Sequence, residues 1–293
     1  MKNAIIFVLF LLLSTTAVSQ TNLQYNLKEG EVYKIKQEAQ QVILQEMDGA
    51  VHELTNKITG LLEFQVIKER DTTFEIDLFF RDLSLVMTSS IQGELMNVKA
   101  SEVDENDIQS KIFNSLLNEP VHMILSKNGD ILEVTGGDSL VIKMSGASGI
   151  TDEFSLNMMK KSLEREFGSE ALSNSYEQMT FIYPSKPVRV GESWKNEYQG
   201  KLSARNSWLL EALSESTATI KGEADITMDV SEPISTMKLD GSQSTWIKTD
   251  LLSGFIVSMK VEGSSKGVTI MAQMGNAEIP TSIQSVTTYE LIQ

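Results

Sequence analysis

The residue types best suited to metal and acid–base chemistry are sparse in this chain. It contains two histidines, His52 and His122, and no cysteine. A zinc site needs three or four ligands, and neither histidine has another histidine near it at ligand spacing, so only carboxylates could complete a site. We therefore interpret both as ordinary histidines of predicted strands, and we expect no metal site.

Nucleophile and cofactor motifs are also missing. Ser235 and Lys238 have the Ser-x-x-Lys spacing of some serine acylases, but those enzymes place the pair at the start of a helix. Here the pair follows Pro233 in a segment with a β pattern. No Gly-x-Ser-x-Gly turn, phosphate-binding loop or dinucleotide fingerprint occurs. We expect no catalytic residues and no cofactor.

Two acidic segments resemble calcium loops only in part. Residues 126–130 (SKNGD) begin with serine, and Ile131 stands where the loop requires glycine. The carboxylates of residues 104–107 (DEND) do not alternate as such a loop needs. We predict a hairpin turn and a helix start, respectively. The 40 acidic residues still leave open a carboxylate pair that hydrolyses glycosides.

The N-terminus has the pattern of a secretory signal peptide. Lys2 precedes an apolar run, Ala4–Leu13, and small or polar residues follow to Ser19. The run of ten residues is about half of what a transmembrane helix needs. We predict cleavage after Ser19 and an exported protein, periplasmic or extracellular. Without a cysteine after the cut it is not expected to be a lipoprotein, and no later segment reaches transmembrane length.

The charge of the chain argues against polyanionic partners. Its net charge is −15, and removal of residues 1–19 takes away Lys2 alone, which leaves −16. Such a surface repels nucleic acid and anionic lipid heads, because these are bound through Lys and Arg. The 41% hydrophobic content is that of a globular protein.

Alternating apolar residues predict antiparallel strands in the first third. Residues 31–47 and a return strand flank Asp48-Gly49, a dipeptide typical of tight hairpins. Every second residue of the return strand lies on the same face, and most of these residues are apolar. Polar or small residues interrupt this apolar series at three places. The whole set is His52, Leu54, Asn56, Ile58, Gly60, Leu62, Phe64 and Val66. The alternation of residues 74–80 then changes parity at 83–87, which predicts a β-bulge near Arg81.

The middle of the chain is expected to be helical, and the last third β again. Apolar residues every four positions predict a helix around 108–116, and two more are expected near 152–167 and 169–179, with Thr151 and Ser169 as N-caps and Gly168 between them. Clean alternation then continues from residue 188 onward, and the last strand is predicted from Ile283 to Leu291.

The fold class that follows is mainly β (α+β). We expect two antiparallel curved sheets, with duplicated half-barrels as one form of this arrangement, and a helical segment in the middle. The predicted divisions are a signal peptide at 1–19, an N-terminal β-sheet module with a helical insertion at 20–183, and a C-terminal antiparallel β module at 184–293.

Two short sequence echoes raise the question of an internal duplication. Residues 30–34 (GEVYK) match 191–195 (GESWK), each a glycine followed three positions later by an aromatic residue. Residues 129–131 and 254–256 form a second, weaker pair in the same order. Either the chain is a repeat, or glycine and glutamate simply end turns before aromatic strands.

The phrases GEVYK at 30–34 and PVRVGESW at 187–194 resemble a functionally uncharacterised family of bacterial envelope proteins that begin with a signal peptide. The resemblance covers most of the mature chain and implies no activity and no site residues. Many such relatives carry a lipobox cysteine, which this chain lacks. At the level of fold alone, long curved hairpins with covering helices resemble the half-barrels of periplasmic lipoprotein carriers.

A set of methionine and aromatic residues in the helical segment is the one candidate for a binding site. Core packing between helix and sheet is the simpler interpretation. The alternative is a pliable apolar pocket, because methionine adapts to varied ligands. The set is Met144, Phe154, Met158, Met159, Phe167 and Met179.

Three functions remain open at this level. The first is a non-enzymatic binding or carrier protein of the bacterial envelope, with an apolar ligand on the concave face of a sheet. The second is a structural or protein-interaction module that binds an envelope protein and no small ligand. The third is a carboxylate-based hydrolase.

Overall fold

The computed structural model describes residues 20–47, 49–231, 235–272 and 275–292. The predicted signal peptide and Asp48 lie outside these ranges. The strands are β1 (Val32–Met47), β2 (Ala50–Glu69), β3 (Thr73–Ser89), β4 (Gly93–Lys99), β5 (Pro120–Ser126), β6 (Ile131–Thr135), β7 (Ser193–Tyr198), β8 (Leu202–Leu213), β9 (Thr217–Ser231), β10 (Ser235–Asp250), β11 (Ile256–Met271) and β12 (Ala277–Ile292). The helices are α1 (Ile108–Leu116), α2 (Gly137–Ala147), α3 (Glu153–Phe167) and α4 (Ser169–Thr180).

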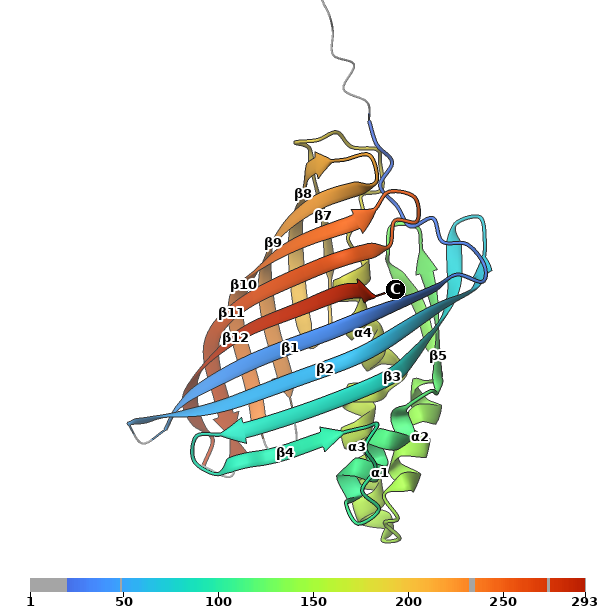
Figure 1. Cartoon of the computed structure of the whole chain (residues 1–293). Coiled ribbons are helices and arrows are strands. Elements are labelled where there is room, and N and C mark those ends of the chain that lie inside the picture. The colour runs from blue at the N-terminus through green and yellow to red at the C-terminus, as the bar shows by residue number, and fades with distance from the viewer. Residues whose placement is uncertain (1–19, 48, 232–234, 273–274, 293) are drawn as a thin grey trace, which may run out of the picture.

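All the strands belong to one antiparallel, twelve-stranded sheet that curls strongly and does not close on itself (Figure 1). Its order is β6-β5-β3-β2-β1-β12-β11-β10-β9-β8-β7, with β4 paired to β3. The mainly β class with helices in the middle is thus confirmed. The two predicted curved sheets are halves of one sheet, because β1 pairs with β12 along twelve residues.

Side chains alternate between the two faces of the sheet along each strand, and this alternation shows which residues lie on the concave face. Ile35 pairs with Leu62 and Leu291, all on the inner side, whereas their neighbours Lys34 and Glu63 point outward. The main hydrophobic core combines residues from both halves of the chain and includes a tight aromatic cluster. Within it, the ring of Phe255 stacks on that of Tyr33 at 4.0 Å. The domain boundary between residues 183 and 184 stays a prediction.

The predicted bulge in β3 is confirmed. Phe80 pairs with Leu62 and Asp82 pairs with Leu61, so Arg81 is the extra residue. The bulge aims the guanidinium of Arg81 at Glu63 Oε1, 2.7 Å away, and over the ring of Phe79. This hydrogen bond lowers the pKa of Glu63 to about 2 and so keeps a largely buried carboxylate ionised on the outer face.

Glycines let the backbones of β10 and β11 approach closely where the sheet bends. A Cβ on Gly241 would lie 2.1 Å from the carbonyl oxygen of Ser264, and a Cβ on Gly267 would lie 2.1 Å from that of Lys238. Glycine kinks of this kind let a sheet curl instead of staying flat.

The helices differ in detail from expectation. The helix around 108–116 is confirmed as α1, but α2 has no counterpart in the sequence prediction. The N-cap of α3 is Asp152 and not Thr151, because the Asp152 carboxylate accepts a hydrogen bond from the N–H of Ser155 at 2.8 Å. Gly168 ends α3 and caps α4, so Ser169 is already helical. The last strand is also longer than predicted.

The two strand starts that share a sequence also share their hydrogen bonds. Gly30 and Gly191 both have φ near +90°, at 87° and 88°. Gly30 donates to the carbonyl of Val66 on β2, and Gly191 donates to that of Leu210 on β8. In each case the following glutamate accepts, through its carboxylate, a hydrogen bond from the backbone N–H three residues earlier. This agreement supports the interpretation of the chain as a duplication.

Helix α4 and the segment that follows it fill the gap between the sheet edges β6 and β7. We call this segment, residues 181–188, the seam. Asn196 of β7 donates to the carbonyl of Phe181 at 2.7 Å, and Trp194 donates to that of Ile182 at 3.1 Å. On the other side, the N–H of Tyr183 donates to the carbonyl of Asn128 in the β5–β6 turn at 3.2 Å.

An N-terminal strap, residues 20–27, crosses the same region. Thr21 pairs with Val188, and the backbone of Tyr25 donates to the carbonyl of Lys127 at 2.8 Å. Leu23, Tyr25 and Leu27 are buried in the core. The strap therefore connects the seam to both halves of the sheet.

The carboxyl group of Glu177 on α4 lies close to that of Asp130, beside the seam. Burial, together with the nearby Asp130 carboxylate, raises the pKa of Glu177 to about 7. Asp130 belongs to the β5–β6 turn, so the contact joins α4 to one edge of the sheet. When Glu177 is deprotonated, two negative charges face each other across the seam.

We expect Gly241→Val to destabilise the fold by roughly 2 kcal/mol or more, because the added side chain collides with the backbone of β11. Urea unfolding followed by circular dichroism measures the loss. Gly146→Ala is the control, since a Cβ there meets nothing within 4 Å in helix α2, and a change within about 1 kcal/mol is expected. Equal stability of the two variants would contradict the role of the kink.

The Glu177–Asp130 contact predicts a pH dependence. The folded protein holds the Glu177 proton up to about pH 7, whereas the unfolded chain releases it near the ordinary value of 4.5. Stability therefore falls as pH rises from about 4.5 to 7. Glu177→Gln should flatten this part of the urea-midpoint profile, and Glu170→Gln, elsewhere on α4, should not. An unchanged profile in the Glu177 variant would argue against the contact.

Candidate functional site

An interior cavity of about 260 Å³ lies on the concave side of the sheet, between β1–β2 and β8–β9. Residues of seven strands that are neighbours in the sheet (β1, β2 and β8–β12) and one residue of α4 line it. The lining residues are Ala39, Gln40, Gln41, Asn56, Ile58, Gln178, Leu202, Ile226, Met228, Gln243, Val261, Gly263, Ser264, Ser265, Ile283, Ser285 and Thr287. None of these residues carries a formal charge.

A row of inner-facing amides crosses the sheet at the level of this cavity, and we call it the amide belt. Its members pair with one another in register from strand to strand, separated only by small residues. In sheet order from β2 to β7 the row is Asn56, Gln41, Ser285, Gly263, Gln243, Ala224, Asn206 and Asn196. The rows on either side contain aliphatic residues such as Ile58 and Ile226.

The part of the belt on β7 and β8 is structural. The Asn196 side-chain oxygen accepts hydrogen bonds from Asn206 at 3.0 Å and from the indole of Trp208 at 2.9 Å. Its amide nitrogen donates to Phe181 in the seam. The Trp208 ring in turn covers Gly222 on β9, where a Cβ would lie 2.3 Å from it. These amides therefore hold the β7 edge to the seam.

The part of the belt on β1 and β2 is only partly satisfied. Asn56 Nδ2 donates to Gln41 Oε1 at 3.3 Å, and with the amide in this orientation the Asn56 Oδ1 atom is buried and has no hydrogen-bond partner. An unpaired buried acceptor costs about 1–3 kcal/mol. Such a cost is commonly retained where a ligand or an ordered water completes the bond.

Phenols next to the cavity region stay neutral. Burial, with contributions from Tyr289 and Glu177, raises the pKa of Tyr198 well above its ordinary value, and its hydroxyl is a second buried group without a partner. Burial also raises the pKa of Tyr289 to about 12. These phenols are therefore uncharged at neutral pH.

A wider, open depression of about 510 Å³ adjoins the cavity, and we call it the mouth. Gln178 and Leu202 line both spaces. The mouth is bounded by α3, α4 and the β7–β8 turn, and a salt bridge between Lys201 and Glu166, at 2.8 Å, crosses it. Charged side chains therefore begin at the mouth, where water reaches them.

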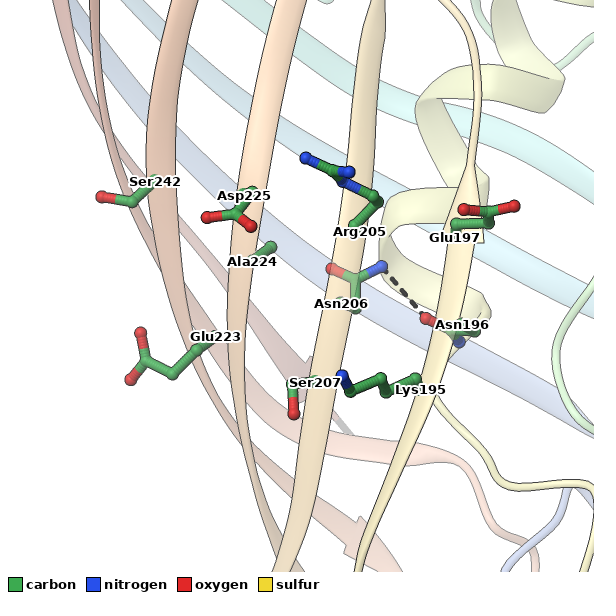
Figure 2. A pocket seen from close by; sticks show the side chains of 10 residues that line it. All are labelled: Lys195, Asn196, Glu197, Arg205, Asn206, Ser207, Glu223, Ala224, Asp225 and Ser242. Atoms are coloured by element: carbon green, nitrogen blue, oxygen red, sulfur yellow. Dashed lines mark hydrogen bonds between the residues drawn. The ribbon is translucent and has the colours of Figure 1, made fainter.

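A second depression, of about 740 Å³, lies over β7–β10 (Figure 2). Its lining combines charged and hydroxyl side chains of the outer face with Asn196, Asn206 and Ala224 of the amide belt. Glu197, Arg205 and Asp225 pair in register across three strands, so the charge alternates from strand to strand. Such cross-strand pairs stabilise a solvated sheet surface. It is open along its length, so we prefer the interior cavity as the candidate site.

The six methionine and aromatic residues named from the sequence are not gathered in one place. Met144 and Met179 are fully buried in the core, and Met159 and Phe167 pack against it. Phe154 and Met158 are exposed on α3, at 75% and 48%. None of the six lines the interior cavity, and their role as a pocket stays a prediction.

The amides that line the cavity were not predicted as a site. A signal existed at Asn56, because a polar residue interrupts the apolar face of β2 there. For Gln41 on β1 and Gln243 on β10, only the pairing of the strands shows that the side chain lies on the inner face of the sheet.

The histidines and carboxylates form no further site. His122 Nδ1 lies 2.8 Å from Asp77 Oδ1, and His52 Nδ1 is buried without a partner. The 104–107 segment starts a helix as predicted, since Asp107 caps α1. Within the described ranges, no group of three or more His, Asp or Glu residues could hold a metal ion. In the same part of the chain, no helix combines the length and hydropathy needed to cross a membrane.

Comparison with solved structures shows a similar fold in lipovitellin, which was solved to describe its lipid–protein interactions. The TM-score is 0.52 at 10% sequence identity, over 92% of this chain and 26% of that one. The chain thus spans about a quarter of the lipovitellin chain. Matches at lower TM-score include an exported protein with a YmcC-like fold from Bacteroides fragilis NCTC 9343 (0.24, 11% identity, 93% of this chain and 100% of that one). An outer membrane channel from Pseudomonas putida F1 gives 0.25 at 7% identity, with 92% of this chain and 97% of that one covered.

Sequence comparison places the chain in a family. No curated protein matches it significantly. The profile of one family matches residues 71–256, which is more than half of the chain and includes the helical segment and much of the concave face. The chain therefore belongs to DUF6263, a family of unknown function.

Proposed function

We propose that this protein is an exported, non-enzymatic binding or carrier protein of the bacterial envelope that holds an apolar chain in its interior cavity. The observation that carries the proposal is the cavity itself, which is uncharged and lined by aliphatic side chains together with amides and hydroxyls from the curled sheet and α4. Ligand sites are typically concave and apolar with a few polar groups that fix orientation. The fold shared with part of lipovitellin agrees with this.

Access through the mouth fits a carrier. Gln178 and Leu202 line both the mouth and the cavity, and the cavity's volume of about 260 Å³ lies just below the usual range of ligand-site volumes. It suits a single short acyl or alkyl chain. The exported location rests on the predicted signal peptide, and cleavage after Ser19 would leave the strap of residues 20–27 intact.

The hydrolase alternative is weaker. Glu177 and Asp130 are a carboxylate pair in which burial raises the pKa of Glu177, but they form the contact between α4 and the β5–β6 turn. Neither lines the interior cavity, the mouth or the outer depression. A glycoside hydrolase needs both carboxylates to face a substrate.

A variant with a larger side chain in the interior cavity tests the proposal. N-phenyl-1-naphthylamine, a neutral apolar probe, should bind the wild-type protein with increased fluorescence. Ala39→Phe should weaken this binding at least about tenfold, because the new ring occupies the cavity. Thr59→Phe is the matched control, since Thr59 is exposed on the outer face of the adjacent strand β2. Thermal unfolding establishes that both variants fold.

Failure of the wild type to bind the probe, or equal binding by both variants, would refute the carrier proposal. Absence of probe binding together with a stable complex with another envelope protein would favour the interaction module instead.

Export makes a separate prediction. The protein recovered from its native envelope or medium should begin at Gln20, partly as pyroglutamate, and intact mass spectrometry measures this directly. Recovery of a chain that retains residues 1–19 would contradict the predicted cleavage.

A further inference from the structure

We infer that the interior cavity selects a neutral amphiphile whose head group is a hydroxyl, and that Asn56 on β2 accepts its hydrogen bond. This inference rests on the proposed function, because it names the class of ligand that the same cavity would take. Fatty alcohols and monoacylglycerols have this chemistry, whereas fatty acids at neutral pH do not.

The first argument is the unpaired oxygen. Asn56 Oδ1 is buried and has no partner, while the other end of the same amide is engaged by Gln41 at 3.3 Å. The Asn56 side chain lines the cavity. A donor on a ligand would therefore complete the bond without disturbing the Gln41 contact.

The second argument is the supply of donors around the ligand. Gln41, Gln243 and Gln178 line the same cavity from β1, β10 and α4. Each is an amide that can donate as well as accept. A hydroxyl both donates and accepts, so it can satisfy Asn56 and receive a hydrogen bond from one of these amides. An ether can only accept, and an alkane can do neither.

The third argument is the absence of a counter-ion. No lysine, arginine or histidine is among the residues that line the cavity. At the mouth, Lys201 is already paired with Glu166 at 2.8 Å. A carboxylate or phosphate in the cavity would be buried without compensation, which is strongly unfavourable. The net charge of −15 adds to the exclusion of anions.

The aliphatic rows beside the amide belt position the chain of such a ligand. Ile58 and Val261 lie on one side of the belt and Ile226 and Ile283 on the other. With the head group on the belt, an alkyl chain would lie against these residues. The belt therefore determines the position of the head group, and the flanking rows contribute the apolar contact.

Isothermal titration at pH 7.5 with three ligands of equal chain length tests the inference. The ligands are 1-decanol, decyl methyl ether and decanoate. We expect 1-decanol to bind roughly fivefold more tightly than the ether, because only the alcohol donates to Asn56. Decanoate should bind at least about a hundredfold more weakly than 1-decanol, because its charge has no partner.

Asn56→Leu should reduce the ratio of alcohol affinity to ether affinity from roughly fivefold to about one. Asn97→Leu is the matched control, because Asn97 is an exposed amide on β4 outside the cavity. Asn56→Ala, which also removes the acceptor and adds no charge, should lose the preference in the same way and serves if the leucine variant does not fold.

The outcomes separate the two proposals. If all three ligands bind equally, if decanoate binds best, or if Asn56→Leu weakens alcohol and ether alike, the inference is wrong and the carrier proposal stands. If none of the three ligands binds the wild-type protein, the carrier proposal fails, and the inference fails with it.

Discussion

An antiparallel sheet that does not close on itself leaves backbone donors and acceptors without partners along its edge strands unless something covers them. In this protein the curl of the sheet brings β6 and β7 to opposite sides of α4, and the seam covers both. Asn196 and Trp194 bind the seam from one edge, and the β5–β6 turn binds it from the other. The concave face, the cavity and its mouth all depend on this closure.

The same closure separates charge from the interior. Glu63 is ionised on the outer face, where Arg81 holds it, and the alternating charges of β7–β9 also point outward. The amide belt is neutral, and the phenols near it keep their protons. The polar groups that line the cavity are thus amides and hydroxyls, which give direction to a ligand without requiring a counter-ion.

The two halves of the sheet begin in the same way. Each half begins with a glycine of positive φ and a glutamate that accepts from the backbone N–H three residues earlier. The first half also supplies the helices, and the second supplies the glycine kinks at Gly241 and Gly267. The halves join where the first strand pairs with the last, so neither of those long strands forms an edge.

Local pattern was enough to establish several elements from the sequence by itself. The mainly β class, the β1–β2 hairpin, the bulge at Arg81, helix α1 and the break at Gly168 follow from periodicity and turn chemistry, because these depend on neighbours along the chain. Helix α2 was missed, since its glycines and β-branched residues disfavour a helix until tertiary packing stabilises it.

Only the tertiary structure decided that the two predicted sheets are one, because the pairing of β1 with β12 joins residues at opposite ends of the chain. It also decided where a ligand could lie. Asn56, Gln41 and Gln243 come together through strand register, and a contact that depends on the alignment of five strands has no signature in any one of them. The sequence determined which faces could be buried, and the curl of the sheet determined what those faces enclose.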